Sequence, residues 1–151
     1  MIRSKSLFLL FFFTLSISAS INKAPSDTRE YATFTLKNGI EVVTVSDKNL
    51  ATSAATLSVG VGQFQDPDDA QGIAHYLEHM IFMGSKKYKK PNEYMQFISE
   101  NGGSTNAFTA TEQTTYLFSI NSDKFEAGLD RLSAAIKAPI FDPSMAVSYT
   151  H

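Results

Sequence analysis

The stretch Gly72-Ile73-Ala74-His75-Tyr76-Leu77-Glu78-His79-Met80 organises this chain, because it spaces two imidazoles and a carboxylate at i, i+3 and i+4. On an α-helix these three side chains share one face. With His75 taken as zero, His79 lies roughly 40° to one side and Glu78 roughly 60° to the other, with Phe82 between them. The spacing therefore predicts a helix that carries both imidazoles and the carboxylate on one face.

The other side of that helix is apolar, because Ile73, Leu77 and Met80 point about the opposite way. We expect this stripe to be buried, so that packing and chemistry are separated on two faces. Two neutral imidazoles four residues apart can supply adjacent corners of a tetrahedron around Zn²⁺, and a catalytic zinc keeps a further corner for water. Glu78, turned away from His79, is the candidate to take the proton of that water. The alternative is that the two histidines and Glu78 form a hydrogen-bonded cluster with a structural role only.

Three stretches together carry a family resemblance. They are Gly-Ile-Ala with the H-x-x-E-H motif at 72–79, Met-Ile-Phe-Met-Gly-Ser-Lys-Lys-Tyr at 80–88, and Asn-Gly-Gly-Ser-Thr-Asn-Ala-Phe-Thr at 101–109. H-x-x-E-H is the inverzincin signature. From about Tyr31 to Asp142 the sequence resembles the pitrilysin/insulysin family of zinc metallopeptidases, as an N-terminal fragment. In that family several domains of one longer chain close around a peptide.

The resemblance assigns roles to individual residues. It implies that His75 and His79 are zinc ligands and that Glu78 is the general base. Phe82, one turn beyond His79, is a weaker candidate for a pocket wall, with plain core packing as the alternative. One segment of the chain matches the strand that pairs with peptides in the family. This mode of binding has a physical basis, because an edge strand offers unpaired backbone groups to any peptide. The residues of this segment are Asn106, Ala107 and Phe108.

The resemblance is incomplete at the third zinc ligand. In the family this ligand is a glutamate on a later helix, about as far downstream as the chain reaches, whereas residues 143–151 contain no carboxylate. Two protein ligands are too few for a stable catalytic zinc site. We expect the chain alone to bind zinc weakly and to have little or no peptidase activity. Substitutes by chemistry, none favoured by its spacing, are Glu93, Glu100, Glu112, Glu126 and His151.

Both ends of the chain differ from its middle. Residues 1–20 resemble a signal peptide, with Arg3 and Lys5 before an apolar run at 7–17 and small residues at 18–20. This segment predicts export to a periplasm or secretion, and an anchor or a buried first helix is the alternative. It is too short for a comfortable membrane span, so we expect no stable membrane insertion once it is removed. We expect residues 143–151 to be an atypical tail, either a truncation or a foreign, misread end.

Composition excludes some classes of partner and of stabilisation. Without residues 1–20 the net charge would be about −4, which argues against nucleic acid or an anionic membrane surface as a partner. The chain has no cysteine, so packing must stabilise it without disulfides.

The order of predicted elements indicates an α+β fold, a mainly antiparallel sheet with helices packed on one face. Residues 21–30 form a flexible lead-in and 31–142 a partial N-terminal metallopeptidase domain. We expect a hairpin around Asn38-Gly39, a third strand buried on both faces, and a sheet that begins with at least three strands. The predicted strands are 31–36, 40–45, 52–61, 104–109 and 113–120, and the predicted helices are 70–83, 91–100 and one that begins at 121–123 and ends at Pro139.

The H-x-x-E-H motif and the family resemblance together predict zinc-dependent endopeptidase activity. The substrate would be a peptide or small protein bound as an added strand. The remaining domains of a full-length chain would be partners. A non-catalytic module of the same fold that binds peptides or a subunit is the alternative, and a structural domain without metal is a third possibility. Histidine and carboxylate ligands also accept cobalt or manganese, so the metal is not fixed to zinc by chemistry alone.

Overall fold

The computed structural model describes residues 21–141, which divide into two units at Asn49 and Leu50. The first unit is a hairpin of β1 (Glu30–Thr35) and β2 (Glu41–Ser46), which pair antiparallel with Tyr31 opposite Val45. Its turn follows the predicted Asn38-Gly39 signal, because Gly39 has φ +87°, a value that few residues other than glycine adopt at low cost. The hairpin prediction is confirmed.

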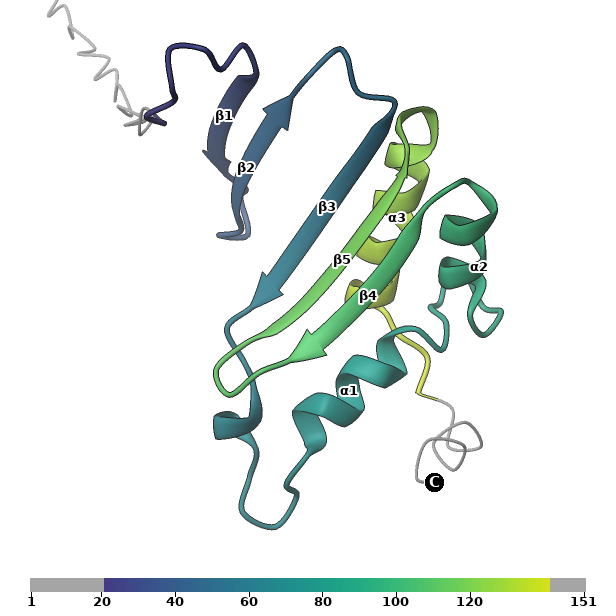
Figure 1. Cartoon of the computed structure of the whole chain (residues 1–151). Helices are drawn as coiled ribbons and strands as arrows, with labels where there is room; N and C mark the ends of the chain where they lie inside the picture. The colour runs from purple at the N-terminus through teal and green to yellow at the C-terminus, as the bar shows by residue number, and fades with distance from the viewer. Residues whose placement is uncertain (1–20, 142–151) are drawn as a thin grey trace, which may run out of the picture. The chain divides into compact units, whose positions relative to one another are not determined.

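The second unit is a three-stranded antiparallel sheet with three helices, shown in Figure 1. The strands β3 (Thr52–Val59), β4 (Ser104–Thr109) and β5 (Thr114–Asn121) have the order β3-β5-β4. The helices are α1 (Ile73–Ile81), α2 (Glu93–Glu100) and α3 (Phe125–Lys137), with short 3₁₀ turns η1 (Gln63–Gln65) and η2 (Ser122–Lys124). The α+β class is therefore confirmed.

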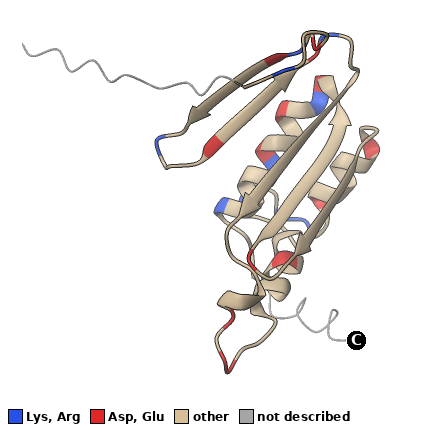
Figure 2. Ribbon diagram, turned by 60° about the vertical axis from the view of Figure 1, so that its left-hand side comes forward, with Lys and Arg blue, Asp and Glu red and all other residues tan. Residues whose placement is uncertain are grey.

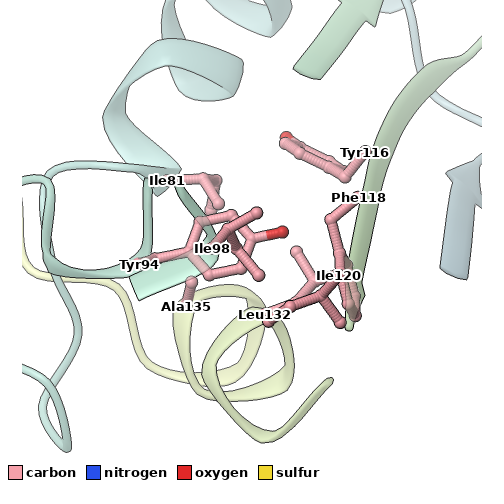
Figure 3. Close-up of a cluster of buried hydrophobic side chains, with 8 residues drawn as sticks. All are labelled: Ile81, Tyr94, Ile98, Tyr116, Phe118, Ile120, Leu132 and Ala135. Carbon is pink, nitrogen blue, oxygen red and sulfur yellow. The ribbon is translucent and has the colours of Figure 1, made fainter. Parts of the chain in front are cut away.

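All three helices cover the same face of this sheet. Every second side chain of β5 is buried on that face, beginning with Tyr116, and each helix contributes buried side chains against them (Figure 3). The opposite face carries hydroxyl, amide and apolar groups, since none of the three strands contains a charged residue (Figure 2). The core cluster comprises Ile81, Tyr94, Ile98, Tyr116, Phe118, Ile120, Leu132 and Ala135.

A cationic side chain joins helices α2 and α3 beside this core. The guanidinium of Arg131 lies 3.6 Å from the ring centroid of Phe97 and 4.4 Å from that of Tyr88. Its Nε donates to the Glu93 carboxylate at 3.0 Å. Stacked arginine on aromatic rings is favourable when it is partly shielded from water, so these contacts fix α2 against α3.

One expectation about the strands is wrong. Within the first unit β1 pairs with β2, and within the second β3 pairs with β5. A sheet that begins with three strands, which would join the two units, stays a prediction. Strand β3 is not buried on both faces. It alternates half-buried Ser53, Ala55 and Leu57 with exposed residues, because it lies at a sheet edge and the helices cover one face only.

The predicted ends of the chain lie outside the described residues. This applies to the signal peptide at 1–20 and to the tail at 143–151, which includes His151. Among residues 21–141, no helix has both the length and the apolar character that a membrane crossing requires.

Candidate metal centre

Helix α1, which carries the H-x-x-E-H motif, is capped at its start by the carboxylate of Asp66. The N-cap residue itself is Gly72, which makes no side-chain hydrogen bond to the helix. The Asp66 carboxylate accepts the backbone N–H of Gly72 at 2.7 Å and that of Ala74 at 2.9 Å. A negative charge here also complements the positive end of the helix dipole. Asp66 thus fixes where α1 begins, three residues later than predicted. The sequence indicated acidic residues before the helix without indicating which one binds.

The face of α1 that packs on the sheet is not the one predicted. Ile73 and Leu77, two of the three residues in the expected buried stripe, are 49% and 43% exposed. The reason is that α1 lies against β4 with the side that carries the motif carboxylate. Packing and chemistry are therefore not separated on two faces. The buried residues of α1 are Ala74, Glu78, Met80 and Ile81.

Glu78 is a buried carboxylate with a specific partner. The residue is only 6% exposed, and its Oε2 accepts a hydrogen bond of 2.6 Å from Thr109 Oγ1 at the end of β4. A carboxylate buried without such a partner would be costly. Burial and the negative charge of Glu78 together raise the pKa of the neighbouring Tyr116 to about 12, so this phenol stays neutral at ordinary pH.

The two histidines of the motif meet through their Nε2 atoms, which lie 3.1 Å apart. His75 is exposed and His79 is half-buried. One possible ligand atom from each histidine and from Glu78 fits within 4.8 Å of the others. Two ligands of a tetrahedral zinc ion, each at about 2.0–2.1 Å, lie roughly 3.3 Å apart. The imidazole pair therefore has close to the spacing that a shared metal ion requires.

The four glutamates named as possible substitute ligands, Glu93, Glu100, Glu112 and Glu126, do not join this cluster. Within residues 21–141 the one such group contains His75, Glu78 and His79 alone. Glu93 instead pairs with Arg131, and Glu100 accepts a hydrogen bond from Gln96.

Phe82 lies at the C-terminal end of α1, half-buried among aromatic rings. Its ring stacks on Tyr94 with 5.8 Å between centroids and meets Tyr116 edge-on at 6.0 Å. Phe82 packs against the core in this way. Its role as a pocket wall stays a prediction.

Strand β4, which contains the predicted peptide-pairing segment, is an edge strand. It pairs with β5 on one side, and no other described strand pairs with its outer edge. Asn106 and Phe108 are exposed on the uncovered face of the sheet, and Ala107 packs toward the core. Because Thr109 of the same strand binds Glu78, the free edge and the histidine cluster are neighbours. Thr109 lies inside the 101–109 motif, but the sequence contained no signal for its contact with Glu78.

Comparisons with known proteins agree in sequence and in fold. Residues 41–148 match the family model "Insulinase (Peptidase family M16)". Insulin-degrading enzyme of Homo sapiens is 45% identical over 128 residues, and "Insulin-degrading enzyme-like 1, peroxisomal" of Arabidopsis thaliana is 45% identical over 120 residues. These matches cover 85% and 80% of the chain, but only 13% and 12% of the relatives. The crystal structure of pitrilysin superposes with a TM-score of 0.84 at 39% identity, over 87% of this chain and 14% of that one.

Proposed function

The chain belongs to the insulinase family of peptidases, family M16. On that basis we propose that it forms part of a zinc-dependent metalloendopeptidase. The observation that carries the proposal is the cluster of His75, Glu78 and His79 against the free edge of β4. The substrate class is a peptide or small protein. Because the chain spans about an eighth of the length of its relatives, the remaining domains of a longer protein would be its partners.

Three side chains have distinct tasks in this mechanism. His75 and His79 would hold the metal through their ring nitrogens, which are already close together. Zinc, when bound there, supplies polarisation of the scissile carbonyl and of the attacking water. The Glu78 carboxylate accepts a proton from that water and delivers it to the leaving amine. Burial of Glu78 beside neutral Tyr116 keeps competing solvent from the carboxylate.

Strand β4 would hold the substrate as an added strand beside the cluster. The backbone of Asn106, Ala107 and Phe108 would pair with the peptide backbone, which requires no particular substrate sequence. Selectivity would come from side chains such as Phe108, which is 46% exposed. Phe82 would form part of a pocket wall.

The proposal has a direct test in metal binding. A catalytic zinc site has three protein ligands and a water, and the described cluster has two imidazoles and the proposed base. Calorimetric titration of residues 21–151 with Zn²⁺ is therefore expected to show weak binding that His75→Ala abolishes. Peptidase activity of this polypeptide alone is expected to be slight or nil. Tight, stoichiometric zinc binding would contradict the incomplete ligand set.

The role of Glu78 needs a longer protein that carries this domain. There, Glu78→Gln is expected to retain zinc and to lower turnover by about 10²–10⁴-fold, the usual contribution of a general base. Unchanged turnover would reject the base assignment.

A non-catalytic binding module is the second candidate, and the two-imidazole ligand set favours it. Peptide binding to β4 without cleavage, in a longer protein with zinc present, would support this alternative. Equal melting temperatures with and without zinc would instead favour a structural domain that binds no metal, because a ligand that binds only the folded state raises its stability.

Export to a periplasm or secretion remains a prediction from residues 1–20.

A further inference from the structure

Thr109 connects the edge strand to the helix that carries the histidines. It is the last residue of β4, its side chain is half-buried on the helix-covered face, and its hydroxyl donates to Glu78 Oε2 at 2.6 Å. Because Glu78 is only 6% exposed, water has little access to replace this donor. The orientation of the carboxylate therefore depends on one hydroxyl from another element.

The hydroxyl of Thr109 is itself held in place. Thr109 lies directly opposite Thr114 in the β4–β5 ladder, and their Oγ1 atoms are 3.4 Å apart. Thr114 donates to the Val61 carbonyl oxygen at 2.9 Å, which anchors it in turn. A β-branched side chain has few rotamers, so the Thr109 hydroxyl is stiffly directed at Glu78.

We propose that Thr109 is a positioning residue for Glu78. Its hydroxyl holds one carboxylate oxygen, leaves the other to exchange protons, and fixes the carboxylate relative to the strand that would bind the peptide. This inference rests on the proposed function. Its predicted consequence is that removing the hydroxyl releases the carboxylate toward the histidine pair, because possible ligand atoms of all three residues lie within 4.8 Å of one another.

The same strand offers a matched control. Thr105 lies on the same face of β4 and is also half-buried, but its hydroxyl donates to the Leu117 carbonyl oxygen at 2.9 Å and lies 3.1 Å from the Tyr94 hydroxyl. Thr105→Val removes a hydroxyl without touching Glu78. Thr109→Ser keeps the hydroxyl and is the conservative rescue.

The first experiment is a double-mutant cycle on the full chain, measured by urea unfolding. Thr109→Val and Glu78→Leu are each expected to favour unfolding. The double variant should raise the unfolding constant about tenfold less than the product of the two separate increases. The reason is that a hydrogen bond to a charged group couples the two residues. Thr105→Val with Glu78→Leu should show no coupling. Coupling of Thr109 to Glu78 below twofold would overturn the proposal.

The second experiment uses Co²⁺, whose visible absorption spectrum reports its ligands, as a probe for the metal site. Thr109→Val is expected to change the spectrum of the full chain with excess Co²⁺, whereas Thr109→Ser and Thr105→Val should retain the wild-type spectrum. A wild-type spectrum that Thr109→Val leaves unchanged would overturn the positioning role alone. Absence of Co²⁺ binding to the wild type would overturn the proposed metal site of His75 and His79, whereas the coupling measured by urea unfolding would still decide whether Thr109 holds Glu78.

Discussion

At the scale of single residues, the site combines two environments within a few ångströms. His75 is exposed to solvent, whereas Glu78 and Tyr116 are buried. Residue types and spacing were enough to select the three motif residues, because the helical repeat brings them together wherever the helix lies. Neither the burial of Glu78 nor its bond to Thr109 was predictable, since both depend on a strand that begins 26 residues later in the chain.

The buried tyrosines predict a loss of stability at high pH. Burial raises the pKa of Tyr94 to about 12, and burial together with Glu78 does the same for Tyr116. Both groups therefore bind their proton more tightly in the folded state than in the unfolded state, where the pKa is about 10. Their stabilisation is complete below pH 10 and is lost as pH rises from 10 to 12, by at most about 2–3 kcal/mol for each tyrosine. Urea unfolding at pH 8 and pH 11 should show this loss, and Tyr116→Phe should reduce it. An equal loss in that variant would contradict the assignment to Tyr116.

At the scale of elements, α1 depends on a contact outside its own residues. Asp66→Ala is expected to destabilise the fold by about 0.5–2 kcal/mol, the usual cost of losing a helix cap, because two N–H groups at the start of α1 lose their acceptor. Chemical denaturation measures this change. Asp69→Ala is the control, since Asp69 is an exposed acidic residue of the same loop. Equal effects of the two substitutions would show that general charge, not the cap, matters.

The start of β4 requires close contact between two backbones. A Cβ on Gly103 would lie 1.9 Å from the Ser119 carbonyl oxygen and 2.9 Å from the Ile120 Cα. Gly103→Ala should therefore destabilise the protein by about 1–3 kcal/mol or more through overpacking. Gly60→Ala, with no atom within 4 Å of the added Cβ, should be close to neutral. Thermal melting of the two variants compares them, and similar melting temperatures would contradict the predicted clash.

The elements were predictable to within a few residues, but their rotation and pairing were not. Strand alternation, the Asn-Gly turn and helical spacing are local signals, and they placed all five strands and all three helices of the described chain. Helix α1 carries apolar residues on two sides, Ile73 and Leu77 on one and Ala74 and Ile81 on the other. Only its contact with β4 decides which side is buried. The pairing of β3 with β5, across two intervening helices, likewise has no local signal.

At the scale of the whole molecule, the second unit presents two strand edges that no other described strand covers, on β3 and on β4. A peptide that binds as an added strand should protect the backbone amides of β4 from hydrogen exchange, because β4 adjoins the histidine cluster. Residue-resolved exchange with and without a peptide measures this protection. The β3 amides serve as the internal control, and protection confined to β3 would contradict the proposed binding edge.

The free edge of β4 also bears on how copies of this chain behave at high concentration. Natural edge strands commonly carry lysine, proline or a bulge that discourages neighbours from joining the sheet, and β4 has the sequence Ser-Thr-Asn-Ala-Phe-Thr, with neither lysine nor proline. If β4 accepts any extended backbone, as proposed, its edge makes no distinction between a peptide substrate and another protein molecule. Openness to many peptides and a tendency toward self-assembly would then be two aspects of a single surface.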